Sequence, residues 1–569
     1  MRQSVERTTS EREVNLIEKR LSSPTVTFVL VVATIGAIVY ISYLLRPEYR
    51  GDTLPYTMVI VAELFLIMQG LLSIWTILNS KFNPHNFEYH NAQDLLFGKR
   101  RAKSLIRKLH EMPIEQSRDL AMYMGFEKIT VDVFIPVFGE PVTEIRETAI
   151  AARDMYGQHK TYILDDGRSN DVKKMAKDIG IDYIRRPIHD HAKAGNINYA
   201  LTQTHGKLFV ILDADFVARP RFLYETVPFF ENEKLAFVQT PQFYGNNVNF
   251  VSTAASYMQH VFYAMVMSGK NRFNAAFCVG TNVVFRRKAV ESIGGIYNKS
   301  KSEDIWTAML LHERGYQSLY TNRVLAIGKT PETLKAYAKQ QLRWATGSFE
   351  IFLRRNPLLN KNLTTDQRLQ YFSATSFYFN GFAVAMLVLL PPLQIFFNIT
   401  PIALDIPVWQ WAVLYSGFYV TQLVLSFYAM GGIKWQTVII SAASFPIYIK
   451  AFFNALLHRD QAWQTTNSIK RGGDSAFNYI RFQVYVFLFL LLTTAVGVWK
   501  AWYTSEFSIS LIWNGLNTLV FAYIVAVGLH EKRQLRRTEP VLQSRPRRFT
   551  VPIRKVVNVE VIERSKNNR

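Results

Sequence analysis

Long apolar segments flank a more polar middle region of the chain. Residues 25–45 contain no charged residue, and residues 56–79 contain a single one, Glu63. At about 1.5 Å per helical residue, each segment is long enough to cross a hydrocarbon layer of ~30 Å. Pro47 and Pro55 lie in the short loop between the two segments. The pattern therefore predicts a membrane-spanning helical hairpin.

Apolar segments resume beyond the middle region, and four of them are predicted to cross the membrane. They cover residues 370–397, 406–430, 482–498 and 508–529. A fifth, residues 435–457, is apolar but contains Pro446 and Lys450. The basic tail from residue 531 onward is expected on the same side as the middle region, according to the positive-inside rule. Two crossings before that region and four after it satisfy the rule, so we expect residues 435–457 to be interfacial or partly embedded.

Short β-rich runs alternate with helical stretches in the middle region. Four runs rich in Val, Ile, Phe and Leu are predicted strands, over residues 130–137, 160–164, 182–185 and 208–212. Near-continuous apolar strands are typical of a parallel sheet buried on both faces. The expected fold is an α/β nucleotide-binding domain with a mostly parallel central sheet, inserted in an α-helical transmembrane domain. Its site is expected at the carboxyl ends of the strands.

The pattern divides the chain into six regions. These are a cytoplasmic tail, a helical hairpin, a basic linker, the α/β domain, a second helical region and a basic cytoplasmic tail, over residues 1–24, 25–80, 81–125, 126–350, 351–530 and 531–569. About twenty polar residues precede the first apolar run, and no small-residue cleavage pattern follows it, so we expect no cleavable signal peptide. The α/β domain and both tails are expected in the cytoplasm.

Charge and cysteine content narrow the class of protein. The chain has 66 Lys and Arg against 44 Asp and Glu, a net charge of +22. Much of this excess lies beside apolar segments, where Lys and Arg mark the cytoplasmic side and contact anionic lipid. No DNA- or RNA-binding motif accompanies it, so the expected partner is a lipid bilayer and not nucleic acid. Cys278 is the only cysteine, which excludes an internal disulfide and a Cys-based zinc site.

Two pairs of aspartates directly follow predicted strands. Asp213 and Asp215 come after the fourth strand, and two carboxylates at this spacing suffice to hold a divalent cation against a diphosphate. Asp165 and Asp166, followed by Gly167, come after the second strand and can accept hydrogen bonds from a ribose or a base. Capping aspartates and an ordinary turn are the alternative interpretations. The sheet context favours ligand binding in both cases.

Two further segments of the α/β domain carry candidate chemistry. Residues 191–196 open a predicted helix, whose start favours anions, and Lys193 offers a positive charge to a diphosphate. Asp304 is a candidate general base for an acceptor hydroxyl, with Glu303 beside it. Ser302 followed by two acids is also a plausible helix N-cap, which is the competing interpretation.

The motif Gln340-x-x-Arg343-Trp344 lies on a helical stretch that leads toward the membrane. Arg343 suits bidentate phosphate binding, and Trp344 offers a flat face to a pyranose. A Trp at a membrane interface is the alternative. A polar loop near residues 460–475 could close over a nucleotide, or it is a plain connection between helices. The residues singled out in this loop are Trp463, Thr465 and Thr466.

In this order and between these spans, the motifs resemble those of processive family 2 glycosyltransferases of membranes. The resemblance is to cellulose synthase and, more distantly, to hyaluronan and chitin synthases, and it covers roughly residues 20 to 530. Its most specific pieces are residues 131–136, 140–141, 191–196, 239–241, 302–304 and 340–344. The last of these is the family's usual mark of processive enzymes. The resemblance implies a glycosyltransferase-A-like fold.

The resemblance also implies roles for individual residues. Mg²⁺ or Mn²⁺ would be bound by Asp213 and Asp215, the latter also counted among the catalytic residues with Asp304 and Glu303. The donor nucleotide and its diphosphate would be held by Asp165, Asp166, Lys193, Gln340 and Arg343. The acceptor would meet Trp344, Cys278, Gly280 and Thr281, the last three at the entrance to a channel. Cys278 would be a small packing residue and not a nucleophile.

The chain departs from bacterial cellulose synthases in two places. Residues 463–468 read Trp-Gln-Thr-Thr-Asn-Ser instead of Phe-x-Val-Thr-x-Lys, and the Trp-x-Thr beginning is closer to hyaluronan and chitin synthases. Arg533-x-x-x-Arg537 resembles the linker to a cyclic-di-GMP-binding barrel, but no Asp-x-Ser-x-x-Gly accompanies it and fewer than forty residues follow. Control by cyclic-di-GMP is therefore not expected.

The sequence-based hypothesis is a processive, inverting glycosyltransferase of the plasma (inner) membrane. It would polymerise a β-linked glucan from UDP-glucose and move the growing polysaccharide across the membrane, with a curdlan-like β-1,3, cellulose-like or mixed linkage. The alternatives are a hyaluronan- or chitin-like synthase that uses UDP-N-acetylglucosamine, and a non-processive transferase that places one sugar on a lipid carrier. A transporter with an inactive nucleotide domain is a further rival from another class. Sugar, linkage, oligomeric state and accessory subunits are left open by the sequence.

Overall fold

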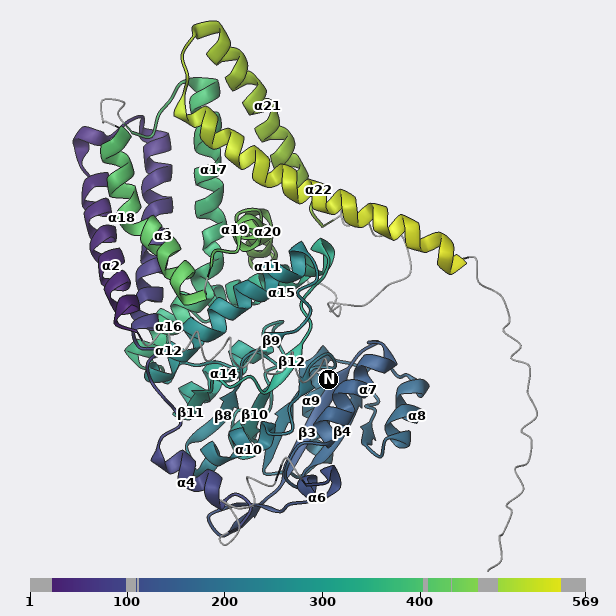
Figure 1. Ribbon diagram of the computed structural model, residues 1–569. Helices are drawn as coiled ribbons and strands as arrows, with labels where there is room; N and C mark the ends of the chain where they lie inside the picture. The colour runs from purple at the N-terminus through teal and green to yellow at the C-terminus, as the bar shows by residue number, and fades with distance from the viewer. Residues whose placement is uncertain are drawn as a thin grey trace, which may run out of the picture.

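An α/β domain lies against a group of long helices (Figure 1). The computed structural model describes residues 23–98, 109, 112–402, 408–430, 432–458 and 479–543. Helices α2 (Pro24–Leu44) and α3 (Thr53–Leu78) precede the α/β domain, and the other long apolar helices follow it. The α/β domain is thus inserted between two sets of apolar helices, as the sequence predicts.

A mixed seven-stranded sheet forms the centre of the α/β domain, in the order β11-β8-β10-β6-β3-β4-β5. Its strands are β3 (Val131–Val137), β4 (Lys160–Asp165), β5 (Asp182–Ile184), β6 (Leu208–Ile211), β8 (Leu235–Gln239), β10 (Val283–Arg286) and β11 (Gln317–Tyr320). Strands β6, β3, β4 and β5 pair in parallel, as do β8 and β11. Only β10 runs antiparallel to its neighbours β6 and β8. The expected mostly parallel sheet is confirmed.

Both faces of the sheet are buried, which explains the unbroken apolar runs of its strands. On one face, Val133 and Ile135 of β3 join a core with Ile145 and Ala149 of α7 (Val142–Arg153). On the other face, Phe134 packs against Phe209 of β6, which in turn stacks on Phe285 of β10. Every residue of β3 is buried. Side chains alternate between faces along a strand, so one continuous apolar segment supplies both cores.

The remaining elements of the α/β domain are short. The strands outside the central sheet are β1 (Met122–Met124), β2 (Glu127–Ile129), β7 (Val217–Ala218), β9 (Phe243–Tyr244) and β12 (Ala326–Gly328). The helices are α4 (Phe87–Leu95), α6 (Ile114–Arg118), α8 (Asn170–Asp178), α9 (Ala192–Gln203), α10 (Phe222–Thr226), α11 (Phe250–Val261), α12 (Ser268–Lys270), α13 (Arg287–Ser292) and α14 (Glu303–Glu313). A π-helical turn, η3 (Phe262–Met267), continues α11.

Five described helices are long and apolar enough to cross a membrane. They cover Pro24–Leu44, Thr53–Leu78, Thr365–Phe397, Arg481–Thr504 and Ile509–Arg533. The third comprises α16 (Thr365–Ser376), a 3₁₀ turn and α17 (Asn380–Phe397), and the last two belong to α21 (Arg481–Thr504) and α22 (Ile509–Gln543). Helix α18 (Val408–Met430) contains a shorter apolar stretch, Ala412–Tyr428. The length and apolar composition of these helices support the prediction of an integral membrane protein.

The segment expected at the interface forms two short helices. Helices α19 (Trp435–Ala442) and α20 (Phe445–Leu456) are bent by 43° at their junction. Figure 1 shows them nearly end-on, whereas α2, α3, α17 and α18 run along the page. Helix α20 packs against α15 (Leu334–Arg354), where Tyr448 and Ala451 meet Ala345 and Phe349. The orientation supports an interfacial placement, which stays a prediction.

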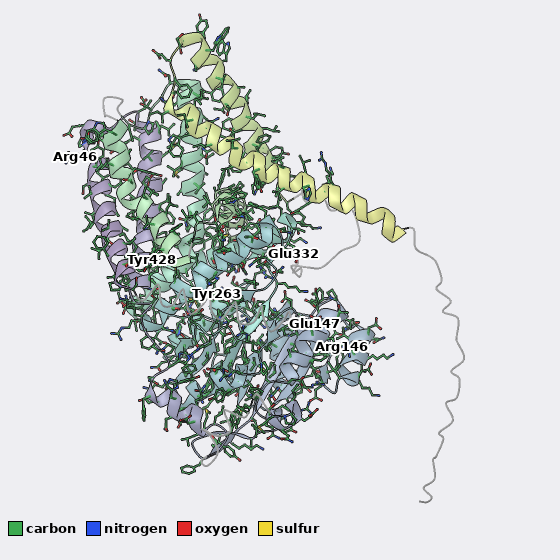
Figure 2. All side chains as sticks on the ribbon, viewed as in Figure 1. Arg46, Arg146, Glu147, Tyr263, Glu332 and Tyr428 are labelled. Atoms are coloured by element: carbon green, nitrogen blue, oxygen red, sulfur yellow. The ribbon has the colours of Figure 1, made fainter. Side chains whose placement is uncertain are left out.

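Helices α2 and α18 approach each other closely although they are far apart in the sequence. A Cβ atom on Gly36 would lie 2.2 Å from the backbone oxygen of Gly417, so only glycine permits this contact. Glu63, the single charged residue of α3, is buried and accepts a hydrogen bond from the hydroxyl of Tyr419 in α18. In Figure 2, Arg46 and Tyr428 mark opposite ends of this three-helix group.

Candidate active site

A cavity of about 680 Å³ opens at the carboxyl ends of the parallel strands. Its walls come from the loops after β3, β4 and β6 and from helices α9, α14 and α15. Ten of the residues singled out in the sequence line it: Asp166, Lys193, Asp213, Asp215, Gly280, Glu303, Asp304, Gln340, Arg343 and Trp344. Asp165, Cys278 and Thr281 lie behind this surface, and the loop residues Trp463, Thr465 and Thr466 lie outside the described residues.

Asp213 is held at the end of β6 by two neighbouring segments. Its backbone N–H donates to the Thr281 hydroxyl at 2.8 Å, and its carboxylate accepts a hydrogen bond from the Lys193 ammonium. Lys193 also donates to the Gly280 carbonyl at 2.8 Å. Burial lowers the pKa of Lys193, but Asp213 and Glu303 outweigh burial and hold this pKa above its ordinary value. The lysine therefore remains a cation inside the cavity.

Asp215 faces the same cavity in a more enclosed position. Burial raises its pKa to about 7, and the charge of Asp213 adds to the increase. The part of the chain that the structure describes holds no cluster of three or more His, Cys, Asp or Glu side chains suited to a metal ion. Two carboxylates nevertheless fit a hard divalent cation that completes its ligand shell with substrate phosphate and water.

The two aspartates at the end of β4, Asp165 and Asp166, have different environments. Asp165 is buried and accepts hydrogen bonds from the Ser169 N–H at 2.8 Å and from the Tyr183 hydroxyl at 2.6 Å. Asp166 lines the cavity and binds Arg186 through two contacts of 2.6 Å. Asp165 thus fixes the turn, whereas Asp166 reaches the site. The role of Arg186 was not predicted, although it closely follows β5, the next parallel strand along the chain.

Residues 191–196 contain two positions with special backbone requirements, His191 and Gly195. His191 has a left-handed backbone conformation with φ of 57°, and it starts the helix that presents Lys193. A Cβ atom on Gly195 would lie 2.1 Å from the Asp190 oxygen and 2.5 Å from a guanidinium nitrogen of Arg186. Gly195 therefore permits the close packing that brings Arg186 and Lys193 to the same side of the cavity.

Asp304 and Glu303 form the first turn of α14. Burial and, to a smaller extent, the neighbouring Glu303 raise the pKa of Asp304 to about 7, although Lys193 and Arg343 act in the opposite direction. Burial also raises the pKa of Glu303. The side chain of Ser302 makes no capping hydrogen bond, so the competing N-cap interpretation lacks its defining contact. A carboxyl group with a pKa near 7 is well suited to general base catalysis.

The segment from Phe277 to Asn282 lies beside Asp304. Gly280 has a φ of +85°, and a Cβ atom there would lie 3.5 Å from a carboxylate oxygen of Asp304 and 3.6 Å from the Lys193 nitrogen. The buried Cys278 thiol donates to the Asp304 backbone oxygen at 2.9 Å, and burial raises its pKa well above the ordinary value. Cys278 is therefore a protonated packing residue next to the candidate base.

Gln239, at the end of β8, holds this segment in place. Its side-chain oxygen accepts from the Val279 N–H at 3.0 Å, and its side-chain nitrogen donates to the Thr281 oxygen at 2.8 Å. Gln239 is completely buried. The sequence motif that contains it contributed to the resemblance, but it gave no indication of this role.

Helix α15 carries Gln340, Arg343 and Trp344 to the cavity and packs directly on the turn before α14. A Cβ atom on Gly347 would lie 1.9 Å from the Ser302 hydroxyl oxygen and 2.5 Å from its Cβ atom. Because this contact leaves no room for a side chain, Gly347 sets the distance between the two segments. The cationic Arg343 and the candidate base Asp304 are thereby brought to one cavity.

Residues 208–430 match the family model described as Glycosyl transferase family group 2. This stretch includes Asp213, Asp304 and Arg343 but not the two apolar helices that precede the α/β domain. The match confirms the resemblance to family 2 glycosyltransferases that the motifs predicted, and it supports the assignment to this class of enzymes.

Curated relatives narrow the comparison. The chain is 36% identical over 261 residues to the UDP-forming cellulose synthase catalytic subunit of Pseudomonas fluorescens (strain SBW25), and 36% identical over 260 residues to that of Komagataeibacter xylinus. Each alignment covers 44% of this chain and 35% of the relative, so the chain spans about a third of their length. Among solved structures, a mannosyltransferase from Pyrobaculum calidifontis is 14% identical with a TM-score of 0.44, covering 68% of this chain and 100% of that one.

Proposed function

We propose that the protein is a membrane-embedded, processive and inverting glycosyltransferase that extends a β-linked glucan from a UDP-sugar. The observation that carries the proposal is one cavity in which a candidate base, Asp304, faces two cations, Lys193 and Arg343. Helices long enough to cross a membrane lie on both sides of this domain in the sequence. The similarity to UDP-forming cellulose synthase subunits supports the same class of reaction.

In the proposed reaction, Lys193 and Arg343 bind the diphosphate of the donor, because both are cations that line the cavity. Asp213 and Asp215 would hold Mg²⁺ or Mn²⁺, which offsets the negative charge that grows on the leaving diphosphate. Asp166, paired with Arg186, would contact the uridine. Gln340 and Trp344 lie on the same helix as Arg343, where Trp344 offers a stacking surface to the acceptor sugar.

Asp304 takes the proton of the acceptor hydroxyl as its oxygen attacks the anomeric carbon. The new carbon–oxygen bond forms while the bond to the diphosphate breaks, and UDP leaves with the electron pair. A single displacement inverts the anomeric centre, so an α-linked donor gives a β-linked product. The raised pKa of Asp304 favours this proton transfer at neutral pH.

UDP-glucose is the proposed donor, and the linkage is β-1,3 as in curdlan, cellulose-like or mixed. The α/β domain and both tails are proposed to lie in the cytoplasm, with the product moving outward across the membrane. The main rival is a non-processive transferase that glycosylates a lipid carrier. The motif on α15 and the apolar helices after it favour the processive reaction.

The purified protein in lipid nanodiscs should be incubated with UDP-glucose or UDP-N-acetylglucosamine and Mg²⁺. We expect UDP release with UDP-glucose and a long product that a linkage-specific β-glucanase digests. Asp304→Asn should release no UDP above background. A product carrying a single sugar would contradict processivity, and UDP release by Asp304→Asn equal to the wild-type rate would contradict the role of the base.

A further inference from the structure

The first turn of α15 receives a hydrogen-bond acceptor from the C-terminal helix α22. The Leu334 N–H donates to the Glu531 carboxylate at 2.8 Å, and the Ala336 N–H donates to the Thr333 hydroxyl at 3.1 Å. The first turn of α15 contains no acidic residue of its own. Because a helix N-terminus carries unpaired N–H groups and partial positive charge, a carboxylate there is stabilising. Glu332, labelled in Figure 2, marks where the chain approaches α15.

Apolar side chains also pack between α15 and α22 around this hydrogen bond. Leu334 is buried in a cluster with Ile480, which precedes α21, and with Phe521 and Ile524 of α22. A Cβ atom on Gly528 would lie 2.8 Å from a methyl carbon of Ile480 and 3.8 Å from one of Leu334. Helix α22 therefore fits closely against the start of α15.

The other half of α15 packs against the turn before α14. Gly347 lies against Ser302, next to the candidate base. Arg343 lies nine positions beyond Leu334, or about 14 Å along the helix axis. A helix moves as a stiff rod over this length, so a displacement of its first turn also displaces Arg343 and Trp344.

We propose that Glu531 is a positioning residue for the nucleotide site: by holding the first turn of α15, it sets where Arg343 and Trp344 stand in the cavity. This inference rests on the proposed function, because it assigns the diphosphate to Arg343. The C-terminal helix thereby acts on donor binding from outside the family-matched region. Glu531 would act through α15 and not by contact with the substrate.

Three variants test the proposal in the full-length protein in nanodiscs. Glu531→Leu removes the acceptor at similar size, Glu531→Gln keeps an acceptor oxygen without the charge, and Glu506→Gln is a control at an exposed carboxylate in the α21–α22 connection. We expect Glu531→Leu to raise the Kd for UDP and the KM for UDP-glucose about fivefold, the size of a typical helix-cap loss, with a smaller change in kcat. Glu531→Gln should lose less, and Glu506→Gln nothing.

A double-mutant cycle separates positioning from general damage. In an Arg343→Lys background, Glu531→Leu should raise the Kd for UDP less than twofold, because its effect passes through Arg343. If Glu531→Leu fails to fold, Thr333→Ala, which removes the other cap of the same turn, should raise the Kd instead. Unchanged UDP affinity, or full additivity with Arg343→Lys, would overturn the inference. Absence of sugar transfer by the wild type would overturn the proposed function instead.

Discussion

Asp304 combines burial with a neighbouring acid, and the two together place its pKa at about 7. The groups around it are Glu303, Lys193 and Arg343, of which the last two favour the ionised form. A general base is active when deprotonated, so UDP release by the wild type should rise between about pH 6 and pH 8 with a midpoint near pH 7. Initial rates at saturating UDP-glucose would measure this profile. A rate that falls over this interval would contradict the assignment.

The Asp304→Asn variant tests the same residue in another way. The substitution keeps the shape of the side chain but removes its capacity to take a proton, so turnover should fall by about 100-fold or more. UDP should still bind, because the diphosphate is assigned to Lys193 and Arg343. Isothermal titration with UDP provides that control. A variant that loses binding and turnover together would point to a structural role.

A side chain at position 347 would have no space. In Gly347→Ala, the new methyl group would meet Ser302, so we expect a stability cost of about 1 to 3 kcal/mol and a large loss of turnover. Gly515→Ala in α22 is the matched control, since no heavy atom lies within 4 Å of its Cβ position. The midpoint of thermal unfolding and the rate of UDP release would be measured for both. Equal behaviour of the two variants would refute the packing argument.

The individual site residues were predictable to different degrees. Asp213 was predicted as a site residue because it directly follows a strand, and Asp304 because an acid in its motif can act as a general base; both line the cavity. Arg186 and Gln239 were missed because their roles exist only through partners distant in the sequence, Asp166 and Val279 respectively. The position of Asp165 behind the cavity could not be predicted either, because adjacent residues leave a strand on opposite faces.

The close packing of α2 against α18 depends on a contact between two glycines, Gly36 and Gly417. Gly36→Val would force them apart, because the added atoms would overlap the backbone of Gly417. We expect a loss of about 1 to 3 kcal/mol in stability, visible as a lower unfolding temperature and less monodisperse protein in detergent. Ile35→Val, at an exposed neighbouring position, should leave both unchanged. Wild-type behaviour of Gly36→Val would show that the two helices do not meet there.

The elements themselves followed largely from apolar patterning. Strand β3 and helix α2 each begin and end within one residue of their predicted limits, because each coincides with a near-continuous apolar run of the sequence. Strands β8, β10 and β11 were not predicted. Each is four or five residues long. Such short strands are stabilised mainly by pairing with neighbouring strands, so their own sequence gives little indication that they form.

The proposed orientation of the whole protein can be tested with engineered cysteines. Cys278 is the only native cysteine and is buried, so it should react little with maleimides. Lys174→Cys, exposed on α8, and Glu506→Cys, exposed between α21 and α22, are expected on opposite sides of the membrane. In intact cells an impermeant maleimide should label only Glu506→Cys, and permeabilisation should add Lys174→Cys. The reverse pattern would place the α/β domain outside.

The Gly36–Gly417 contact also bears on how the chain is made. Roughly 380 residues separate the two glycines. At a synthesis rate of about 5 to 20 residues per second, Gly417 is therefore made about 20 to 80 seconds after Gly36. During that interval the face of α2 around Gly36 lacks the helix that covers it in the folded protein. If the hairpin inserts first, lipid or another protein would have to cover this face until Gly417 has been synthesised.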